Sequence, residues 1–166
     1  WVQFGLWLLR PRAVREFRAS TVPLDPWRPF FEKLLLAVDR VHESETLAEF
    51  WRYGRLVPNT AHRHPYETNV PQKYRDVPRW FLLDTDLDPE RPWEMTTNIP
   101  VFSMALVHGE TGKRLWLVYS HSPLKDRRDV EITLPDFGKV TVDVPRAGAF
   151  YVVYEERRDV SRLDVQ

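Results

Sequence analysis

The sequence contains no cysteine. That absence excludes disulfide bonds, thiol catalysis and zinc sites with cysteine ligands, and it leaves the redox compartment undecided. The 6 glycines are scattered at turns, so no glycine-rich loop is available to hold a phosphate group. Basic and acidic residues both number 24, and this balance argues against nucleic acid or an anionic membrane as a partner.

Long apolar runs are also absent. No run approaches the ~20 residues of a membrane-spanning helix, and the longest, Phe4 to Leu9, lacks the features of a signal peptide. We therefore expect a soluble protein with no membrane partner and no targeting segment, and the sequence does not indicate its compartment. No cofactor is predicted. A thermophilic source would explain the 14 prolines and the preference for arginine over lysine, and a bias in genome composition would explain them equally.

Apolar runs separated by turn residues fill the last third of the chain, from Ile99 to Glu155. In two of these runs apolar and polar residues alternate, which places one set of side chains in a core and the other in water. Several short strands at near-regular spacing predict an antiparallel sandwich or barrel. The expected strands are Ile99 to His108, Lys113 to His121, Asp129 to Leu134, Lys139 to Val144 and Ala149 to Tyr154.

The clearest helix signal lies further upstream. Asp25 and Pro26 are typical of a helix start, and apolar residues then recur at helical spacing from Trp27 to about His42. Ser44 is expected to cap a second helix, which should end at Gly54. The predicted fold class is therefore α+β, with an N-terminal helical segment packed on a C-terminal antiparallel β-sandwich.

The first two of the expected late strands are apolar on both faces. One face of this pair should be covered, and the helix from Trp27 to Val41 is the best candidate. The continuous apolar run Trp1 to Leu9 predicts a strand that is covered on both faces, and Ala13 to Arg18 can begin a short helix.

We expect a boundary near residue 57, between a helical segment (1–57) and a loop-rich β domain (58–166). Pro58 to Pro78 and Thr85 to Asn98 have the composition of loops, and Arg79 to Asp84 predicts a strand between them. Loops this long inside a compact chain are often functional. We therefore expect any binding site to lie in these loops, with the sheets as its scaffold.

His62 and His64 are two residues apart, and on a strand both would point to the same side. With a carboxylate they could hold a metal ion, although histidines in polar loops more often fasten the loop by hydrogen bonds. Asp84, Asp86 and Asp88 alternate like a calcium loop, but the positions of the required Gly and Glu do not fit. Turn carboxylates are the favoured interpretation, and no metal is predicted.

A catalytic group is not evident. Glu16, Glu67, Asp84 and Glu94 could form a carboxylate pair for glycoside hydrolysis, but the sequence gives no separation between them. Ser120 lacks the strand–turn–helix setting of an activated serine. The sequence alone therefore predicts no catalytic residue.

Aromatic residues are the most suggestive feature of the loops. Trp93, Tyr66, Tyr74 and Trp80 lie in or beside them, and aromatic rings with polar neighbours suit a hydroxyl-rich ligand such as a carbohydrate. The alternative for Trp80 is a place in the core, because three apolar residues follow it, and that alternative is favoured.

The first eighteen residues, WVQFGLWLLRPRAVREFR, resemble the last strand and outgoing helix of a (β/α)8-barrel glycoside hydrolase. The later stretch LWLVYSHSPLKDRRDVEITLPDFGKVTVDVPRAGAFYVVYE resembles the β-sandwich that follows such barrels. The resemblance implies an upstream catalytic domain in the same or a partner chain, since 166 residues cannot hold both parts. It also implies Glu16 as a candidate acid and Arg12 as a substrate contact.

The preferred hypothesis is a C-terminal fragment or accessory domain of a carbohydrate-active protein, which supports or binds a polysaccharide. The starting Trp1, in place of Met, and the orphan strand favour a piece of a longer protein. One alternative is a structural or protein-interaction β-sandwich module without a small ligand. Another is a small metal-dependent hydrolase that uses His62 and His64.

Overall fold

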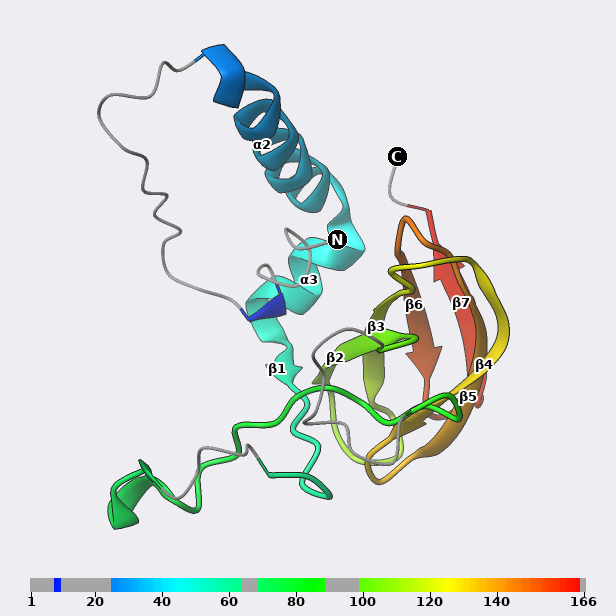
Figure 1. The fold of residues 1–166 in the computed structure, drawn as a ribbon. Coiled ribbons are helices and arrows are strands. Elements are labelled where there is room, and N and C mark those ends of the chain that lie inside the picture. Colours follow the sequence, from blue (N-terminus) through cyan, green and yellow to red (C-terminus); the bar gives the residue numbers. More distant parts are fainter. Residues whose placement is uncertain (1–7, 10–24, 64–68, 89–98, 165–166) are drawn as a thin grey trace.

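The computed structural model describes residues 8–9, 25–63, 69–88 and 99–164. Two helices near the N-terminus are followed by antiparallel sheets, which confirms the predicted α+β class (Figure 1). No helix in these ranges is long and apolar enough to cross a membrane.

The two helices begin and end close to the predicted positions. Helix α2 (Arg28–Glu43) follows a short 3-10 turn, η1 (Asp25–Trp27), and helix α3 (Glu45–Tyr53) follows directly after α2. The Ser44 hydroxyl accepts a hydrogen bond of 3.3 Å from the backbone N–H of Leu47, so Ser44 caps α3 as predicted. Gly54 ends α3 in an extended conformation, and close approach explains the glycine: a Cβ there would lie 2.5 Å from the Phe50 carbonyl oxygen.

The strands form two antiparallel sheets. The larger sheet has the order β1-β2-β3-β6-β7 and the smaller one pairs β4 with β5. Five of these strands match the predicted series closely, and two were missed: the short β1 and the final β7. The bounds are β1 (Arg55–Leu56), β2 (Phe102–His108), β3 (Leu115–His121), β4 (Arg127–Leu134), β5 (Gly138–Val144), β6 (Ala149–Tyr154) and β7 (Asp159–Leu163).

The main core lies between the two sheets. In β4 and β5 the apolar positions are buried and the intervening residues are exposed or half-buried, which confirms the predicted alternation. From the larger sheet, Ala105, Trp116 and Val118 face the same core. Val57 joins it from the start of the loop region. The two sheets therefore pack face to face as a sandwich.

The opposite face of β2 and β3 is also covered, but mainly by a different helix from the one expected. Leu47 and Phe50 of α3 pack there against Leu106 and Leu117, whereas α2 adds only Val41 near its end among the described side chains. The ring of His108 lies edge-on to Phe50 at 4.7 Å. The chain turns at Ser44 between α2 and α3, and most of the length of α2 points away from the sheet (Figure 1).

The predicted strand Arg79 to Asp84 is wrong. The backbone N–H of Leu83 donates to Ser103 in the larger sheet, and the Asp84 carbonyl accepts from Thr133 in the smaller one. The segment crosses from one sheet to the other and bonds to each only once, so no ladder forms.

Two further predictions concern the N-terminal residues. In the run Trp1 to Leu9 only the last two residues are described, and Leu8 has helical backbone and a fully buried side chain, so it does not belong to a strand. The rest of that run and the helix expected from Ala13 to Arg18 lie outside the described residues. The boundary at residue 57 stays a prediction.

Candidate functional site

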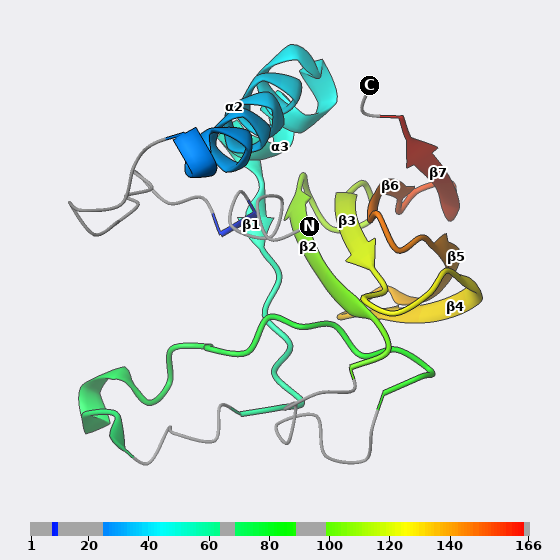
Figure 2. The ribbon, with the colours of Figure 1, turned by 45° about the horizontal axis from the view of Figure 1, so that its top comes forward.

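The loop segments 57–63 and 75–80 line an open pocket of about 160 Å³. These two segments belong to the part of the chain between β1 and β2, which projects away from the sheets (Figure 2). The pocket therefore falls within the loops in which the sequence places a site.

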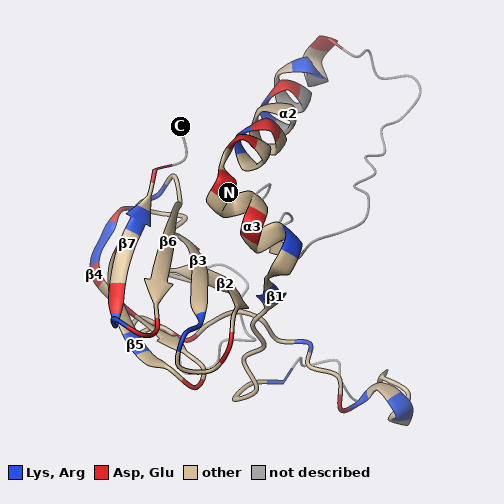
Figure 3. Ribbon diagram, turned by 180° about the vertical axis from the view of Figure 1, so that it is seen from behind, with Lys and Arg blue, Asp and Glu red and all other residues tan. Residues whose placement is uncertain are grey.

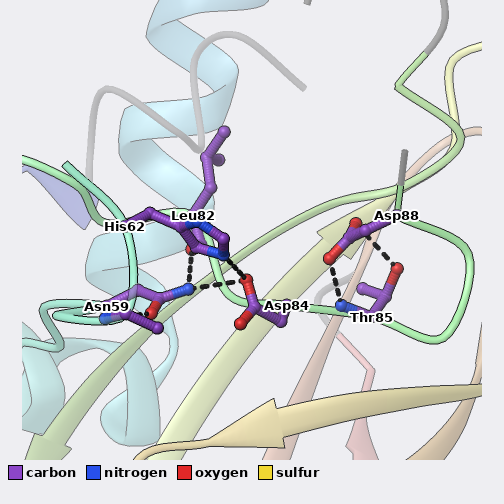
Figure 4. Close-up of polar contacts among 7 residues, drawn as sticks. Asn59, His62, Leu82, Asp84, Thr85 and Asp88 are labelled. Atoms are coloured by element: carbon purple, nitrogen blue, oxygen red, sulfur yellow. Dashed lines mark hydrogen bonds and ion pairs between the residues drawn. The ribbon is translucent and has the colours of Figure 1, made fainter. Parts of the chain in front are cut away.

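Asn59 holds these loops together from a buried position. Its side-chain amide donates to the Leu82 carbonyl at 2.9 Å and to Asp84 Oδ1 at 2.8 Å, as Figure 4 shows. Its own carbonyl oxygen accepts from the backbone N–H of Ala61 at 3.1 Å, which is the geometry of an Asx turn. Its backbone N–H donates to Trp80. One side chain thus fixes the turn and links two segments that are more than twenty residues apart.

His62 shares the same carboxylate oxygen. Its Nε2 lies 2.8 Å from Asp84 Oδ1, and since an ionised carboxylate only accepts hydrogen bonds, Nε2 is the donor. The imidazole ring lies 6.0 Å from the ring of Trp80. Asp84 therefore orients His62, and the imidazole stands beside an aromatic ring at the wall of the pocket.

The other wall of the pocket is held by arginines that bind the backbone. Arg79 donates through Nη1 to the Val77 carbonyl at 3.0 Å and through Nη2 to the carbonyl of Tyr74. Arg75 donates through Nε to Val70 at 3.2 Å. These bonds brace the short 3-10 helix η3 (Gln72–Tyr74) against the segment that leads to the pocket.

The alternating aspartates form hydrogen bonds within and beside the turn that follows Asp84. Asp88 accepts from the backbone N–H of Thr85 at 2.6 Å and from its hydroxyl at 3.0 Å (Figure 4). Burial raises the pKa of Asp88, against the lowering effect of these two hydrogen bonds. Asp86 accepts from the backbone N–H of Glu131 on β4. Within the described ranges no group of three or more metal-ligating side chains occurs.

The structure brings together only some of the predicted binding residues. Trp80 and His62 line the pocket. Trp80 is half-buried and belongs to neither apolar cluster, contrary to the favoured expectation that it lies in the core. Tyr74 is 47% exposed and lies outside the pocket lining, with the Lys73 ammonium 4.7 Å from its ring centre.

The remaining candidates lie outside the described residues. They are the carbohydrate-binding candidates Trp93, Tyr66 and Arg12, the candidate acid Glu16 and the candidate metal ligand His64. Ser120 is described: its hydroxyl pairs with that of Ser103 at 2.8 Å inside the sheet. Ser103 and Ser120 are direct neighbours across β2 and β3, and this hydroxyl pair is buried.

Sequence reasoning did not single out Asn59, Arg75 or Arg79 as organising residues. Proline and asparagine in succession, as at Pro58 and Asn59, are a turn signal, so the turn at Asn59 could have been predicted. Its bond to Asp84 joins positions 25 apart and leaves no local trace. The backbone bonds of the two arginines depend on the path of the loop, which no periodic pattern reveals.

Comparison with protein-family models, with curated proteins and with solved structures finds no match to this chain.

Proposed function

We propose that this chain is an accessory β-sandwich region of a carbohydrate-active protein and that its loop pocket binds a saccharide. The observation that carries the proposal is the placement of the half-buried Trp80 next to the hydrogen-bonded trio of Asn59, His62 and Asp84.

This arrangement suits the chemistry of a sugar. A pyranose ring has an apolar face that packs on an indole, and hydroxyl groups at its rim that need donors and acceptors. Trp80 offers the ring and His62 a polar group whose orientation Asp84 fixes. A pocket wall held by hydrogen bonds loses little conformational entropy on binding, which favours affinity.

The proposal concerns binding and support, and it assigns no catalytic step to the described residues. Hydrolysis would belong to an upstream catalytic domain in the same or a partner chain, as the resemblance of the first eighteen residues implies. The candidate acid Glu16 lies outside the described residues.

Calorimetric titration of the purified chain with a panel of neutral and acidic oligosaccharides tests the proposal. We expect saturable binding for at least one member, with a matching change in tryptophan fluorescence. Trp80→Ala should abolish binding. The control Tyr53→Ala removes a ring that is 68% exposed on α3, and it should bind like the unchanged chain. A folded protein that binds no member of the panel would contradict the proposal.

A second candidate is a protein-interaction module, and one observation favours it. Leu35, Leu36 and Val38 on α2 are 61%, 54% and 41% exposed, and apolar side chains gathered on a projecting helix are typical of a docking surface. Light scattering that shows a monomer at all concentrations, with no binding of an apolar dye, would exclude this candidate.

A further inference from the structure

We infer that the loop pocket selects an acidic saccharide, one whose carboxylate is bound by the Arg75 and Arg79 side of the pocket. The inference rests on the proposed function and adds to it the chemical class of the ligand. It starts from the unequal charge of the pocket walls.

Three arginines line the pocket, Arg63, Arg75 and Arg79, against a single acidic side chain among the described lining residues, Asp76. The whole chain has equal numbers of basic and acidic residues, so this excess is local. Several Lys and Arg positions lie on the projecting loop that carries η3, along with an acidic one (Figure 3). A concave surface with an excess of one charge attracts ligands of the opposite charge.

No ion pair to Arg75 or Arg79 occurs among the residues that the structure describes. Within the described part of the chain, their hydrogen bonds go to the backbone carbonyls of Val70, Val77 and Tyr74. Carbonyl oxygens carry no net charge, so both guanidinium groups keep their full positive charge. By contrast, Arg114 of the β-sandwich forms an ion pair of 2.6 Å with Glu155.

The hydrogen bonds to the backbone leave several N–H donors of Arg75 and Arg79 free to bind a ligand. A guanidinium group has five N–H donors. Arg79 uses one on each Nη, and Arg75 uses its Nε. The remaining donors of each group can bind a carboxylate, and the bonds to the backbone hold the guanidinium in place, so little side-chain entropy is lost when a carboxylate binds. Trp80 next to Arg79 can hold the sugar ring that carries this carboxylate.

Matched pairs of saccharides test the inference: trigalacturonate against trigalactose, and triglucuronate against cellotriose. We expect the acidic member of at least one pair to bind about tenfold more tightly or better, since hydrogen bonds between charged groups contribute at least that much. Raising the salt concentration should narrow this gap, because partly exposed charges are screened.

Arg75→Gln and Arg79→Gln should each remove the preference for the acidic sugar and keep the weaker binding of the neutral one. Arg128→Gln is the matched control: Arg128 is exposed on β4, outside the pocket lining, and its loss should leave the preference unchanged. Circular dichroism verifies the fold of each variant. Because Arg79 braces the loop, Arg75→Gln provides the independent variant if Arg79→Gln unfolds.

Three results would overturn the inference. Equal affinity for both members of each pair would contradict it while leaving saccharide binding intact. If inorganic phosphate or acetate alone bound as tightly as the uronates, the pocket would be a simple anion site. No binding of any saccharide would contradict the proposed function itself, and the acidic preference with it.

Discussion

The β-sandwich and the loop region (residues 57–63 and 69–88) are held together by different forces. The sandwich has two clusters of buried apolar side chains, one on each face of the larger sheet. In the loop region the buried residues are only Val57, Asn59 and Leu83 among those described. Its shape depends on hydrogen bonds from a few side chains, chiefly Asn59, Arg79 and Asp88.

This difference separates stability from binding. Apolar burial is distributed over many side chains, so it resists the loss of one polar contact but is sensitive to a cavity. A loop held by single hydrogen bonds opens locally at lower free energy than the core. Substitutions in the sandwich should therefore change global unfolding, and substitutions in the loop should change the pocket.

The largest effect should come from a cavity in the main core. Trp116 is 2% exposed between the sheets, and Trp116→Ala should lower the free energy of unfolding by about 3–5 kcal/mol. Urea denaturation followed by circular dichroism measures it. Trp80→Ala is the matched control in the loop region and should cost far less, because the indole is half-buried and outside both clusters. Equal losses would show that the loop region is part of the core.

Acid should weaken the sandwich through His121. This residue is 4% exposed, and burial lowers its pKa to about 4 from a usual value of 6.5. Between these two pH values the unfolded chain binds a proton that the folded chain does not. Stability therefore falls as the pH falls from 6.5 to about 4, by about 3 kcal/mol in total, and the His121 contribution levels off below pH 4.

Urea denaturation across this pH range measures the effect. His121→Gln should flatten the profile between pH 6.5 and 4, whereas His42→Gln, at an exposed position on α2, should leave it unchanged. An unchanged slope in His121→Gln would assign the acid sensitivity in this pH range to other groups. Glu155 would not be the cause, because its hydrogen bonds with Arg114 lower its pKa from 4.5 to about 2 and its contribution is lost mainly below pH 4.5.

Two glycines sharpen the contrast between packed and open turns. Gly148 and Gly112 both have left-handed backbone, with φ of +84° and +89°. A Cβ on Gly148 would overlap the Tyr119 hydroxyl, but one on Gly112 would meet nothing within 4 Å. Gly148→Ala should therefore cost about 1–3 kcal/mol more than Gly112→Ala, since overpacking adds to the conformational cost. Thermal unfolding of both variants measures the difference in stability. Equal losses of stability would contradict an overlap between the added Cβ at position 148 and Tyr119.

The difference between the apolar sandwich and the hydrogen-bonded loop region also explains which features the sequence could predict. Strands β4 and β5 each bury one face, so alternation predicts them, and Ser44 predicts the start of α3 because capping is local. The edge strand β7 was missed because its exposed charged positions, Asp159 and Arg162, hide the pattern.

The site was predicted only in outline. Trp80 and His62 could be singled out as candidates because aromatic and imidazole side chains in a polar loop differ from their surroundings, and both line the pocket. The bonds that place them join Asn59 to Leu82 and Asp84, and the sequence does not indicate which distant residues will meet. The assignment of α2 as the main cover of β2 and β3 was wrong for a related reason. The apolar pattern of these strands shows that their outer face must be buried, but it does not show which helix buries it.

The smallest effect on global stability, and the most local one, should come from Asn59→Ala. Removing the amide leaves the Leu82 carbonyl and the backbone N–H of Ala61 without their partners, at a cost of about 1–2 kcal/mol. Since the sandwich is held by its apolar clusters, this cost should appear as local opening. Hydrogen exchange should rise in residues 57–63 and 80–84 and stay unchanged in β3 and β6, and Asn69→Ala, at an exposed loop position, should alter neither. If exchange rose equally throughout the sandwich, the loop and the sheets would unfold as one unit.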